Sequence, residues 1–575
     1  MKKREKFLFI SIGLLTVSLL TGCKKKNFVH DTTSYFSLET GVGPVYRKEA
    51  SDKTKIDVYF AEGEKLVPYI SVKSFSSMFN GFMSQGFKST IEDYKYSTVW
   101  TISYEKTPVF AAEFQWRAGV IEYLGSIDVA LESYATLDVS KSSLYYNAFL
   151  DGKVLDVGKY EGTTGCSYRK SGFSDVFKEG AHHLPLAVYD ISFKEATSKN
   201  FIYDYSNIVI TDDIQNYFND SSVSYSVVDS MKKIIDEQYQ DGAPYYFLEY
   251  NMNCMRLIML YYYGLTKEKN ITSFKLSKAS FRNAFTDLNK DKRVENYYNF
   301  IASLDDDHTL FVGSKAWDEV LSPMPRGSNS YNRSEKNKRL TEKRREKTSD
   351  LLDVVYYSNT GKTAMFYLDE FIFDETQTYV VKGMIKSPEA YKYDTYVYVE
   401  KLLKEISKLD NVDKVVINLA LNGGGVVGVM AKTLSLLNAG KITNIGYFNS
   451  NSYVSMVLKA ELMNKHDYLA NKQLYLLTSD CSFSCGNALP FFAQQMGIAK
   501  IIGEKSGGGE CSVSVKILPN LSYLYHSSTT HLTHFINGDY SYKNRIGADR
   551  RAIPDIEISE DNYFDVNLIE KELNK

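Results

Sequence analysis

Three patterns of apolar and polar residues follow one another along the chain. From about residue 28 to 220, short segments of alternating apolar and polar residues are separated by glycine and polar turns, which predicts β-strands. From about 227 to 310 apolar residues recur every three or four positions, which predicts helices. From about 351 to the end, buried strands and helices alternate. We therefore expect a β-rich (α+β) region at 23–220 that could comprise two small modules, a helical subdomain at 227–312, a charged connector at 313–350 and an α/β domain at 351–575.

The α/β pattern of the last region is regular enough to place its elements. The predicted strands are 364–368, 415–419, 474–478 and 500–502, and the predicted helices are 396–409, 426–437 and 484–496. Such alternation is typical of a parallel sheet with crossover helices, whose functional sites lie at the carboxyl ends of the strands.

In the helical region, an apolar helix ends at Gly264 and a further helix is predicted over 283–304, ending before Asp305. The Tyr and Met residues of the first of these helices are interpreted as core rather than as a cofactor site. The connector contains the basic run RSEKNKRLTEKRREK, in which glutamates are interleaved at spacings that favour a solvated helix with internal ion pairs.

Overall charge argues against nucleic-acid binding. Lysine and arginine total 68, aspartate and glutamate total 70, and the net charge is −2. Hydrophobic residues make up 44% of the chain, which is enough for large globular cores. Charge and composition make no prediction of the oligomeric state.

The N-terminus predicts an export signal. Basic residues precede the short apolar segment FLFISIGLLTVSLL, and the sequence Leu-Thr-Gly that follows ends at Cys23. This arrangement resembles the lipobox of bacterial lipoproteins, in which the cysteine is acylated after cleavage. Residues 1–22 are thus predicted to be a lipoprotein signal peptide, and the mature protein to be lipid-anchored on the extracytoplasmic side of a bacterial membrane. The alternative is an uncleaved anchor helix.

Five further cysteines are Cys166, Cys254, Cys481, Cys485 and Cys511, an odd number that leaves at least one thiol without an intramolecular partner. None has the CxxC spacing of a structural zinc site, so no metal and no cofactor are predicted. An alternative hypothesis is a metal-binding cluster of the histidines at 526, 531 and 534 in a surface protein.

Three motifs lie where the predicted sheet would place a site. Gly423, Gly424 and Gly425 follow a strand, and bare glycine backbone can direct N–H groups at an anion. The segment CSFSCGN places Ser482 or Ser484 between a strand and a helix, where a hydroxyl is either an exposed nucleophile or an ordinary helix cap. His308 stands in the segment Asp-Asp-Asp-His-Thr at a helix end, where a structural role is the alternative to a catalytic one.

Together these motifs resemble the tail-specific or C-terminal-processing serine proteases over roughly residues 228 to 570. The resemblance rests on LDDDHT, NLALNGGG, LLTSDCSFSCGNALPFFAQQMGIAKIIGEKSGGG and AIPDIEI, in that order. It implies a crotonase-like α/β core and assigns the nucleophile to Ser484. Gly509 stands where one branch of the family has a catalytic lysine. His308 instead matches the base of the His-Ser-acid, tricorn-like branch.

The resemblance implies acyl transfer to Ser484 with His308 as general base and an acidic residue that orients the histidine. Asp549 is the preferred acid from its place before the AIPDIEI segment, and the alternatives are Glu557 and Glu510. The implied oxyanion hole uses N–H groups of Gly424 or Gly425 and of Cys485. The implied activity is that of a membrane-tethered serine endopeptidase acting on proteins or peptides.

Two alternatives concern the chemistry itself. Asn487 and Gly509 replace a glutamate and a lysine of the family, so the chain could be a catalytically inactive pseudoprotease that acts as a surface binding or scaffold lipoprotein. Alternatively, Cys485 could be the nucleophile in place of Ser484.

Overall fold

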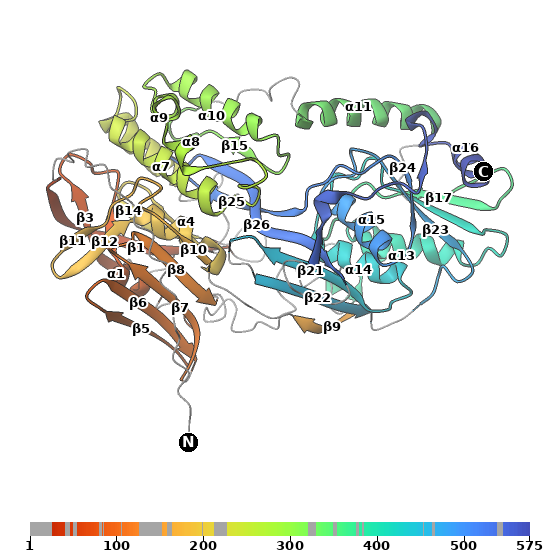
Figure 1. Cartoon of the computed structure of the whole chain (residues 1–575), viewed down its shortest axis with the longest axis horizontal. Helices are drawn as coiled ribbons and strands as arrows, with labels where there is room; N and C mark the ends of the chain where they lie inside the picture. Colours follow the sequence, from red (N-terminus) through yellow and green to blue (C-terminus); the bar gives the residue numbers. More distant parts are fainter. Residues whose placement is uncertain are drawn as a thin grey trace.

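The computed structural model has two lobes joined along one side of the molecule (Figure 1). Neither the predicted signal peptide nor Cys23 is among the described residues. Within the described part, no helix has the length and apolar character needed to cross a membrane. The description covers residues 26–575 apart from 41–46, 50–53, 80–82, 84–85, 105, 126–151, 158–163, 198, 212–226, 320–328, 349–353, 375–378, 382–384, 452–453, 463–465 and 537–543.

The N-terminal region is β-rich, as the alternating pattern predicted. Its larger sheet has the order β11-β12-β4-β3-β1-β14-β13 with β2 beside β1, and its smaller one is β10-β8-β7-β6-β5. The strands are β1 (Phe28–Thr40), β2 (Arg47–Glu49), β3 (Thr54–Ala61), β4 (Tyr69–Ser71), β5 (Phe87–Asp93), β6 (Ser97–Tyr104), β7 (Thr107–Gln115), β8 (Val120–Gly125), β10 (Thr164–Cys166), β11 (Val176–Lys178), β12 (Ala181–Pro185), β13 (Asn200–Tyr203) and β14 (Asn207–Thr211). Helices α1 (Val72–Ser77) and α4 (Leu186–Thr197) each follow directly on a strand, β4 and β12, and these two strands pair with each other.

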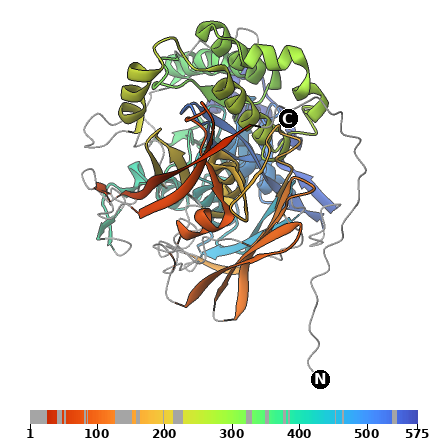
Figure 2. The same cartoon turned by 90° about the vertical axis from the view of Figure 1, so that its left-hand side faces the viewer.

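The helical subdomain lies over the N-terminal sheets (Figures 1 and 2). Its helices are α6 (Val227–Gln238), α7 (Tyr245–Tyr261), α8 (Ser273–Ser277), α9 (Ala279–Phe285) and α10 (Lys290–Leu304). The prediction of a single helix over 283–304 is therefore wrong. It is two helices, because the side chain of Asn289 caps a new helix start by accepting a hydrogen bond from the N–H of Lys292 at 3.0 Å.

One continuous apolar core joins the N-terminal region to the helical subdomain. Aromatic residues of the first sheets, such as Trp100, and methionines of α7, such as Met255, are fully buried in the same cluster. The cluster extends to Leu524, near the C-terminal end of the chain. The Tyr and Met residues of α7 are thus mostly core, as expected. The β-rich region and the helical subdomain share this one core, whereas the C-terminal domain has two further clusters of its own.

The C-terminal domain is built on a mainly parallel sheet of order β16-β17-β20-β23-β24-β28. Side chains alternate between its faces, so α13, α14 and α15 cover one face while α11 and α16 cover the other. The predicted elements of this domain are all found within a few residues. They are β17 (Thr363–Tyr367), α13 (Thr395–Ile406), β20 (Lys414–Asn418), α14 (Val427–Leu437), β23 (Gln473–Thr478), α15 (Cys485–Gln495) and β24 (Lys500–Gly503). The domain also contains elements that were not predicted: β16 (Tyr356–Tyr357), β28 (Ile556–Glu557), α16 (Val566–Leu573) and a short hairpin of β18 (Tyr379–Val381) and β19 (Ile385–Lys386).

A seven-stranded sheet contains strands from the N-terminal region, from the end of the helical subdomain and from the C-terminal domain. Its order is β15-β26-β21-β22-β9, with β25 and β27 also pairing with β26. β9 (Gly152–Val157) comes from the N-terminal region, and β15 (Leu310–Val312) directly follows His308. Pairing of β15 with β26 therefore brings the His308 segment to the C-terminal domain. The remaining strands are β21 (Thr443–Asn449), β22 (Val454–Leu462), β25 (Cys511–Ile517), β26 (Tyr523–Phe535) and β27 (Arg545–Gly547).

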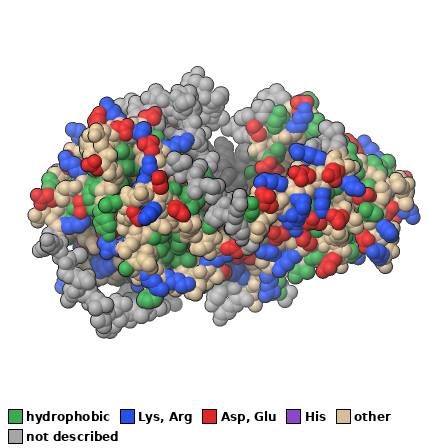
Figure 3. Space-filling model, turned by 90° about the horizontal axis from the view of Figure 1, so that it is seen from above, with side chains coloured by type: hydrophobic (Ala, Val, Ile, Leu, Met, Phe, Trp, Pro, Cys, Tyr) green, Lys and Arg blue, Asp and Glu red, His purple; other side chains and the backbone are tan. Residues whose placement is uncertain are grey.

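The charged connector contains the helix α11 (Asn329–Lys347), as its sequence predicted. One of the expected internal ion pairs, between Lys338 and Glu335, is present within the helix. Other basic side chains of the helix reach acidic residues of the C-terminal domain instead. These pairs are Arg333–Asp480, Lys336–Glu504, Arg339–Glu560, Lys343–Glu560, Lys343–Asp561 and Arg344–Asp369. Positive and negative side chains accordingly intermingle on the face of the C-terminal domain that is seen from above (Figure 3).

Candidate functional site

Ser484 occupies a sharp turn between β23 and α15. Its backbone angles are φ 54° and ψ −122°, a conformation that costs a residue with a side chain about 1–3 kcal/mol. The turn is held by the Ser484 N–H, which donates to the carbonyl of Gly508 at 2.8 Å. Although Ser484 is the N-cap residue of α15, its side chain makes no capping hydrogen bond. The capping interpretation is therefore wrong for Ser484, and the hydroxyl is left available for another partner.

Ser482 has the structural role that Ser484 lacks. Its hydroxyl donates to the carbonyl of Leu419 at 2.7 Å and accepts from the N–H of Ser479 at 2.9 Å. The side chain is fully buried. Ser482 is thus fixed inside the loop and is not available as a nucleophile.

The glycine turn after β20 packs against Ser484. A Cβ atom added at Gly424 would lie 2.8 Å from the Cβ of Ser484, and Gly424 has φ +118°, so both space and backbone conformation require glycine. The N–H of Gly424, one of the predicted oxyanion-hole donors, donates to Asn422 Oδ1 at 2.9 Å in this structure. The N–H groups of Gly425 and Cys485 make no hydrogen bond to any described residue.

The side chain of Cys485 is part of the core. Its Sγ lies 3.1 Å from the carbonyl oxygen of Gly425, to which it donates, and the residue is 1% exposed. Burial raises the pKa of the Cys485 thiol to about 12, so the reactive thiolate is scarce at neutral pH. This environment argues against the alternative in which Cys485 is the nucleophile.

We expect iodoacetamide at about pH 8 to leave Cys485 unmodified in the folded protein, because the thiol is both buried and protonated. Peptide mapping by mass spectrometry measures the modification, and the urea-unfolded protein, in which Cys485 reacts, is the control. Rapid modification of Cys485 in the folded protein would contradict its assignment to the core.

His308 lies between the end of α10 and β15. Asp305 ends α10 in a left-handed conformation, and the backbone N–H of His308 donates to Asp306 Oδ1 at 3.1 Å. The imidazole contacts the ring of Phe483, the neighbour of Ser484, with 4.7 Å between ring centroids. Burial lowers the pKa of His308 below its usual 6.5, so the ring is neutral at pH 7 and can accept a proton.

In the structure, His308 contacts the residue next to Ser484 but is not hydrogen-bonded to Ser484. No hydrogen bond connects Ser484, His308 and Asp549 to one another, although all three belong to the described part of the chain. The Nδ1 atom of His308 is buried and has no hydrogen-bond partner. An orienting acid would normally occupy this position.

Asp549 lies in the short 3₁₀ turn Ala548–Arg550, and its carboxylate is hydrogen-bonded to the neighbouring loop. Its Oδ1 atom accepts from the N–H groups of Gly509 and Glu510 at 2.8 and 3.0 Å. Partial burial and the nearby charge of Glu510 raise the pKa of the Asp549 carboxyl. In this structure Asp549 therefore lies near the site but does not orient His308.

The other two candidate acids are also engaged elsewhere. Glu510 Oε1 lies 2.6 Å from His531 Nδ1, in a buried pair, and Glu510 Oε2 accepts from the N–H of Asp549 at 3.0 Å. Glu557 lies in β28, where it pairs with Gly503 of β24. Neither carboxylate is hydrogen-bonded to His308.

Glu510 is expected to stabilise the fold. Burial raises the pKa of its carboxyl, but the hydrogen bond and charge of His531 outweigh burial and leave that pKa below 4.5. A lowered carboxylate pKa contributes stability above the unfolded-state value of 4.5, and this contribution is lost as pH falls through the folded-state value. Glu510→Gln should therefore lower the free energy of unfolding by about 2 kcal/mol at neutral pH.

Urea unfolding of both proteins at neutral pH and at acidic pH measures this effect. The difference between Glu510→Gln and the wild type should shrink as the pH falls below 4.5. Glu557→Gln, on an edge strand, is the matched control and should change stability little. A difference that stays constant with pH would contradict the role assigned to the Glu510–His531 pair.

The histidines of β26 do not form the alternative metal cluster. His531 pairs with Glu510, while His526 is buried with its Nδ1 3.0 Å from the carbonyl of Ser527. Among the described residues, no group of three or more His, Cys, Asp or Glu side chains is arranged to hold a metal ion.

The two departures from the family pattern have structural explanations. Asn487 is buried in α15, where it donates to the carbonyl of Ala548 at 3.0 Å and accepts from Ser506 Oγ at 2.6 Å. It thereby ties α15 to the turn that contains Asp549. At Gly509, φ is +88° and an added Cβ would lie 2.7 Å from the ring of Phe483, so this position has no room for a lysine.

A cleft of about 250 Å³ opens beside the elbow. On one side it is bounded by the segment that precedes His308, and on the other by the glycine-rich loop that accepts the Ser484 N–H. Such a cleft next to a candidate nucleophile could admit a substrate segment. The cleft is lined by Leu265, Glu268, Lys269, Asp305, Asp306, Asp307, Arg333, Phe483, Gly507, Gly509, Glu510, Cys511, Ser527, Asp549 and Arg551.

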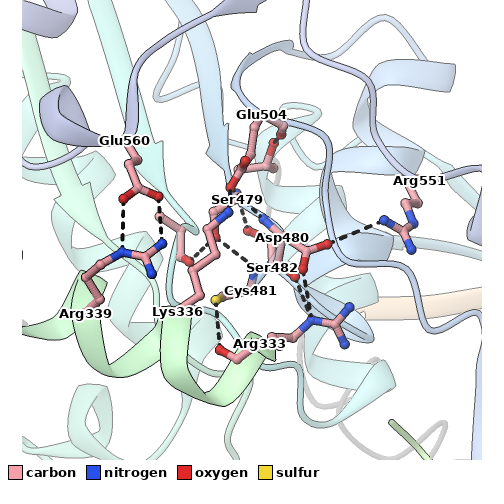
Figure 4. A network of polar contacts seen from close by, with 12 residues as sticks. Arg333, Lys336, Arg339, Ser479, Asp480, Cys481, Ser482, Glu504, Arg551 and Glu560 are labelled. Atoms are coloured by element: carbon pink, nitrogen blue, oxygen red, sulfur yellow. Dashed lines mark hydrogen bonds and ion pairs between the residues drawn. The ribbon is translucent and has the colours of Figure 1, made fainter. Parts of the chain in front are cut away.

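Two residues of this site were missed by the sequence analysis. Phe483 lies between the ring of His308 and the guanidinium group of Arg333, at 4.7 and 4.5 Å. Arg333 belongs to α11 and contacts the loop around Asp480 (Figure 4). The only sequence signal was the basic run of the connector, which does not identify which side chains face the protein.

Comparison with known proteins agrees with the geometry. The family model "Peptidase family S41" matches residues 382–557, the part of the chain that contains the glycine turn and the Ser484 elbow. This segment is therefore a serine-type peptidase domain. No curated protein matches the chain.

Several solved structures are similar to parts of the chain. The photosystem II D1 C-terminal processing protease is 12% identical, covers 55% of this chain and 93% of its own, and has a TM-score of 0.33. A lipoprotein from Streptococcus agalactiae is 10% identical, with 62% and 98% coverage and a TM-score of 0.28. Mature CPAF complexed with lactacystin is 12% identical, with 38% and 52% coverage and a TM-score of 0.28.

Proposed function

We propose that the serine-type peptidase domain at 382–557 makes this protein a serine endopeptidase that cleaves proteins or peptides, with Ser484 as nucleophile and His308 as general base. The observation that carries the proposal is the backbone of Ser484, held at φ 54° and ψ −122° at the start of α15. A strained serine with an uncommitted hydroxyl at a strand-to-helix turn is typical of hydrolase nucleophiles.

The proposed reaction is acyl transfer. Ser484 Oγ attacks the peptide carbonyl carbon while His308 takes the hydroxyl proton, and the amine leaves with that proton. Water then attacks the acyl-enzyme, with His308 again accepting and returning a proton. The tetrahedral oxyanion would be bound by the N–H groups of Gly425 and Cys485, which have no partner among the described residues, assisted by the N-terminus of α15.

The proposed reaction requires hydrogen bonds from His308 to Ser484 and from Asp549 to His308, which this structure does not contain. His308 is in ring contact with Phe483 and so lies one residue from the nucleophile, but it is not hydrogen-bonded to Ser484. Catalytic hydrogen bonds are often formed only in the substrate complex. We propose that substrate binding in the cleft brings His308 onto Ser484 Oγ, and that Asp549 then turns from the Gly509 and Glu510 amides to His308 Nδ1.

The location we propose follows from the N-terminal sequence. Acylation of Cys23 would tether the mature protein to the outer side of a bacterial cell membrane, where it meets extracytoplasmic proteins and peptides. Lys24, Lys25 and Lys26 would then lie at the lipid surface, where anionic headgroups favour them.

A second function, a catalytically inactive binding protein, is favoured by one observation. The Oδ1 atom of Asp549 is held by two backbone amides, and no carboxylate is hydrogen-bonded to the Nδ1 of His308. A pseudoprotease would keep the fold and the peptide cleft without an activated serine.

Labelling with a fluorophosphonate distinguishes these two functions, because the reagent reacts with activated serines. The folded protein from residue 24 onward is treated and its peptides are mapped by mass spectrometry. An adduct confined to the peptide containing Ser484, and absent after unfolding in urea, is expected for the peptidase. Absence of any adduct on folded protein would contradict the proposed activity and favour the binding protein.

A further inference from the structure

Arg333 of α11 contacts both sides of the candidate site. Its Nε donates to the carbonyl of Asp480 at 2.9 Å, and its Nη2 donates to the carbonyl of Gly507 at 3.1 Å. Its Nη1 is in ion-pair contact with Asp307, the residue before His308, but makes no hydrogen bond of regular geometry. Figure 4 shows the arginine reaching from α11 into the loop that begins at Asp480.

These contacts connect Arg333 to the segments that carry Ser484 and His308. Asp480 begins the loop that leads to Ser484, and Gly507 donates its N–H to the carbonyl of Ser482 at 2.8 Å. The guanidinium carbon also lies 4.5 Å from the centre of the Phe483 ring, whose other neighbour is the His308 ring at 4.7 Å. The Arg333 side chain is only 14% exposed, so these interactions are poorly screened by water.

The geometry points to Arg333 as a positioning residue that fixes the His308 segment relative to the Ser484 elbow; this inference rests on the peptidase function proposed above. Arginine suits this task because its planar fork can bond to three groups in fixed directions at once. His308 and Ser484 are 176 residues apart in the sequence, and each is carried by a different part of the chain. A single side chain that binds both segments limits how far they can separate.

Arg339 provides a matched control. It lies on the same helix and also pairs with a carboxylate of the C-terminal domain, Glu560 at 3.2 Å, yet it has no contact with the His308 segment. Loss of either arginine removes an ion pair between α11 and the C-terminal domain. Only loss of Arg333 removes the connection between Asp307 and the elbow.

The test measures Arg333→Ala, Arg333→Lys and Arg339→Ala by two methods. The first is the rate of fluorophosphonate labelling of Ser484, and the second is hydrogen exchange of the peptides spanning 305–312 and 480–486. We expect Arg333→Ala to slow labelling about 100-fold, because an error of 1 Å in the position of a catalytic group has an effect of this order. Arg339→Ala should label like the wild type, and Arg333→Lys should be intermediate, since a lysine keeps the charge but not the fork.

Hydrogen exchange keeps the inference separate from the proposed function. Faster exchange in both peptides of Arg333→Ala, with the rest of the domain unchanged and Arg339→Ala like the wild type, supports the positioning role even if the wild type is not labelled. Absence of labelling in the wild type would count against the peptidase alone. Exchange in Arg333→Ala that matches Arg339→Ala would overturn the positioning role.

A double-mutant cycle with Asp307→Asn adds a second criterion. If Arg333 acts through Asp307, the double variant should exchange no faster in 305–312 than the Arg333→Ala variant alone. Additive effects on exchange would show that Arg333 and Asp307 act independently, and would contradict the proposed connection.

Discussion

Ser484→Ala is expected to abolish peptide hydrolysis and fluorophosphonate labelling. Loss of a nucleophile of this kind lowers kcat about 10⁴- to 10⁶-fold, because no other group can form the acyl-enzyme. The neighbouring Ser482 is fully buried and held by two hydrogen bonds, so it cannot replace Ser484. Hydrolysis of a quenched fluorescent peptide library and labelling of the same preparations measure the effect.

A second substitution at this position separates chemistry from folding. Ser484→Gly also lacks the hydroxyl and should be equally inactive, but glycine adopts φ 54° without strain. We therefore expect the free energy of unfolding of Ser484→Gly to exceed that of Ser484→Ala by about 1 kcal/mol, so that Ser484→Gly unfolds at a higher urea concentration. Full activity of Ser484→Ala would reject the assigned nucleophile. Equal stability of the two variants would show that the backbone strain is relieved elsewhere.

His308→Ala is expected to have the second largest effect, a loss of about 10⁴-fold or more in kcat with little change in KM. The imidazole of His308 contacts the ring of Phe483, the residue before Ser484, with 4.7 Å between ring centroids. His30→Ala, at an exposed position in the N-terminal region, is the matched control and should retain full activity. Activity of His308→Ala equal to that of His30→Ala would exclude His308 as the base.

The pH dependence of the wild type gives an independent check on His308. A general base acts in its neutral form, and burial lowers the pKa of His308 below 6.5. The acid limb of kcat/KM should therefore lie below pH 6.5, and the rate should be constant from there to neutral pH. An acid limb above pH 6.5 would mean that His308 is not the group that titrates.

The sequence by itself determined four strands and three helices of the C-terminal domain, β17, β20, β23, β24, α13, α14 and α15. Each predicted strand and helix of that domain is found within a few residues, because a buried parallel strand and an amphipathic helix leave different periodicities in the chain. The same reasoning placed Ser484 at a strand-to-helix turn. The choice between capping and exposure of its hydroxyl depended on a backbone angle, which periodicity does not contain.

Only the tertiary structure decided which distant residues meet. Pairing of β15 with β26 brings His308 to the C-terminal domain, and Arg333 from a segment predicted to be a solvated helix reaches the elbow. Equally, the N–H of Gly424 donates to Asn422, and Asp549 accepts from backbone amides and makes no hydrogen bond to His308 in this structure. Hydrogen bonds and ion pairs between segments depend on distances that packing sets, whereas a single chain records only the local preference of each residue.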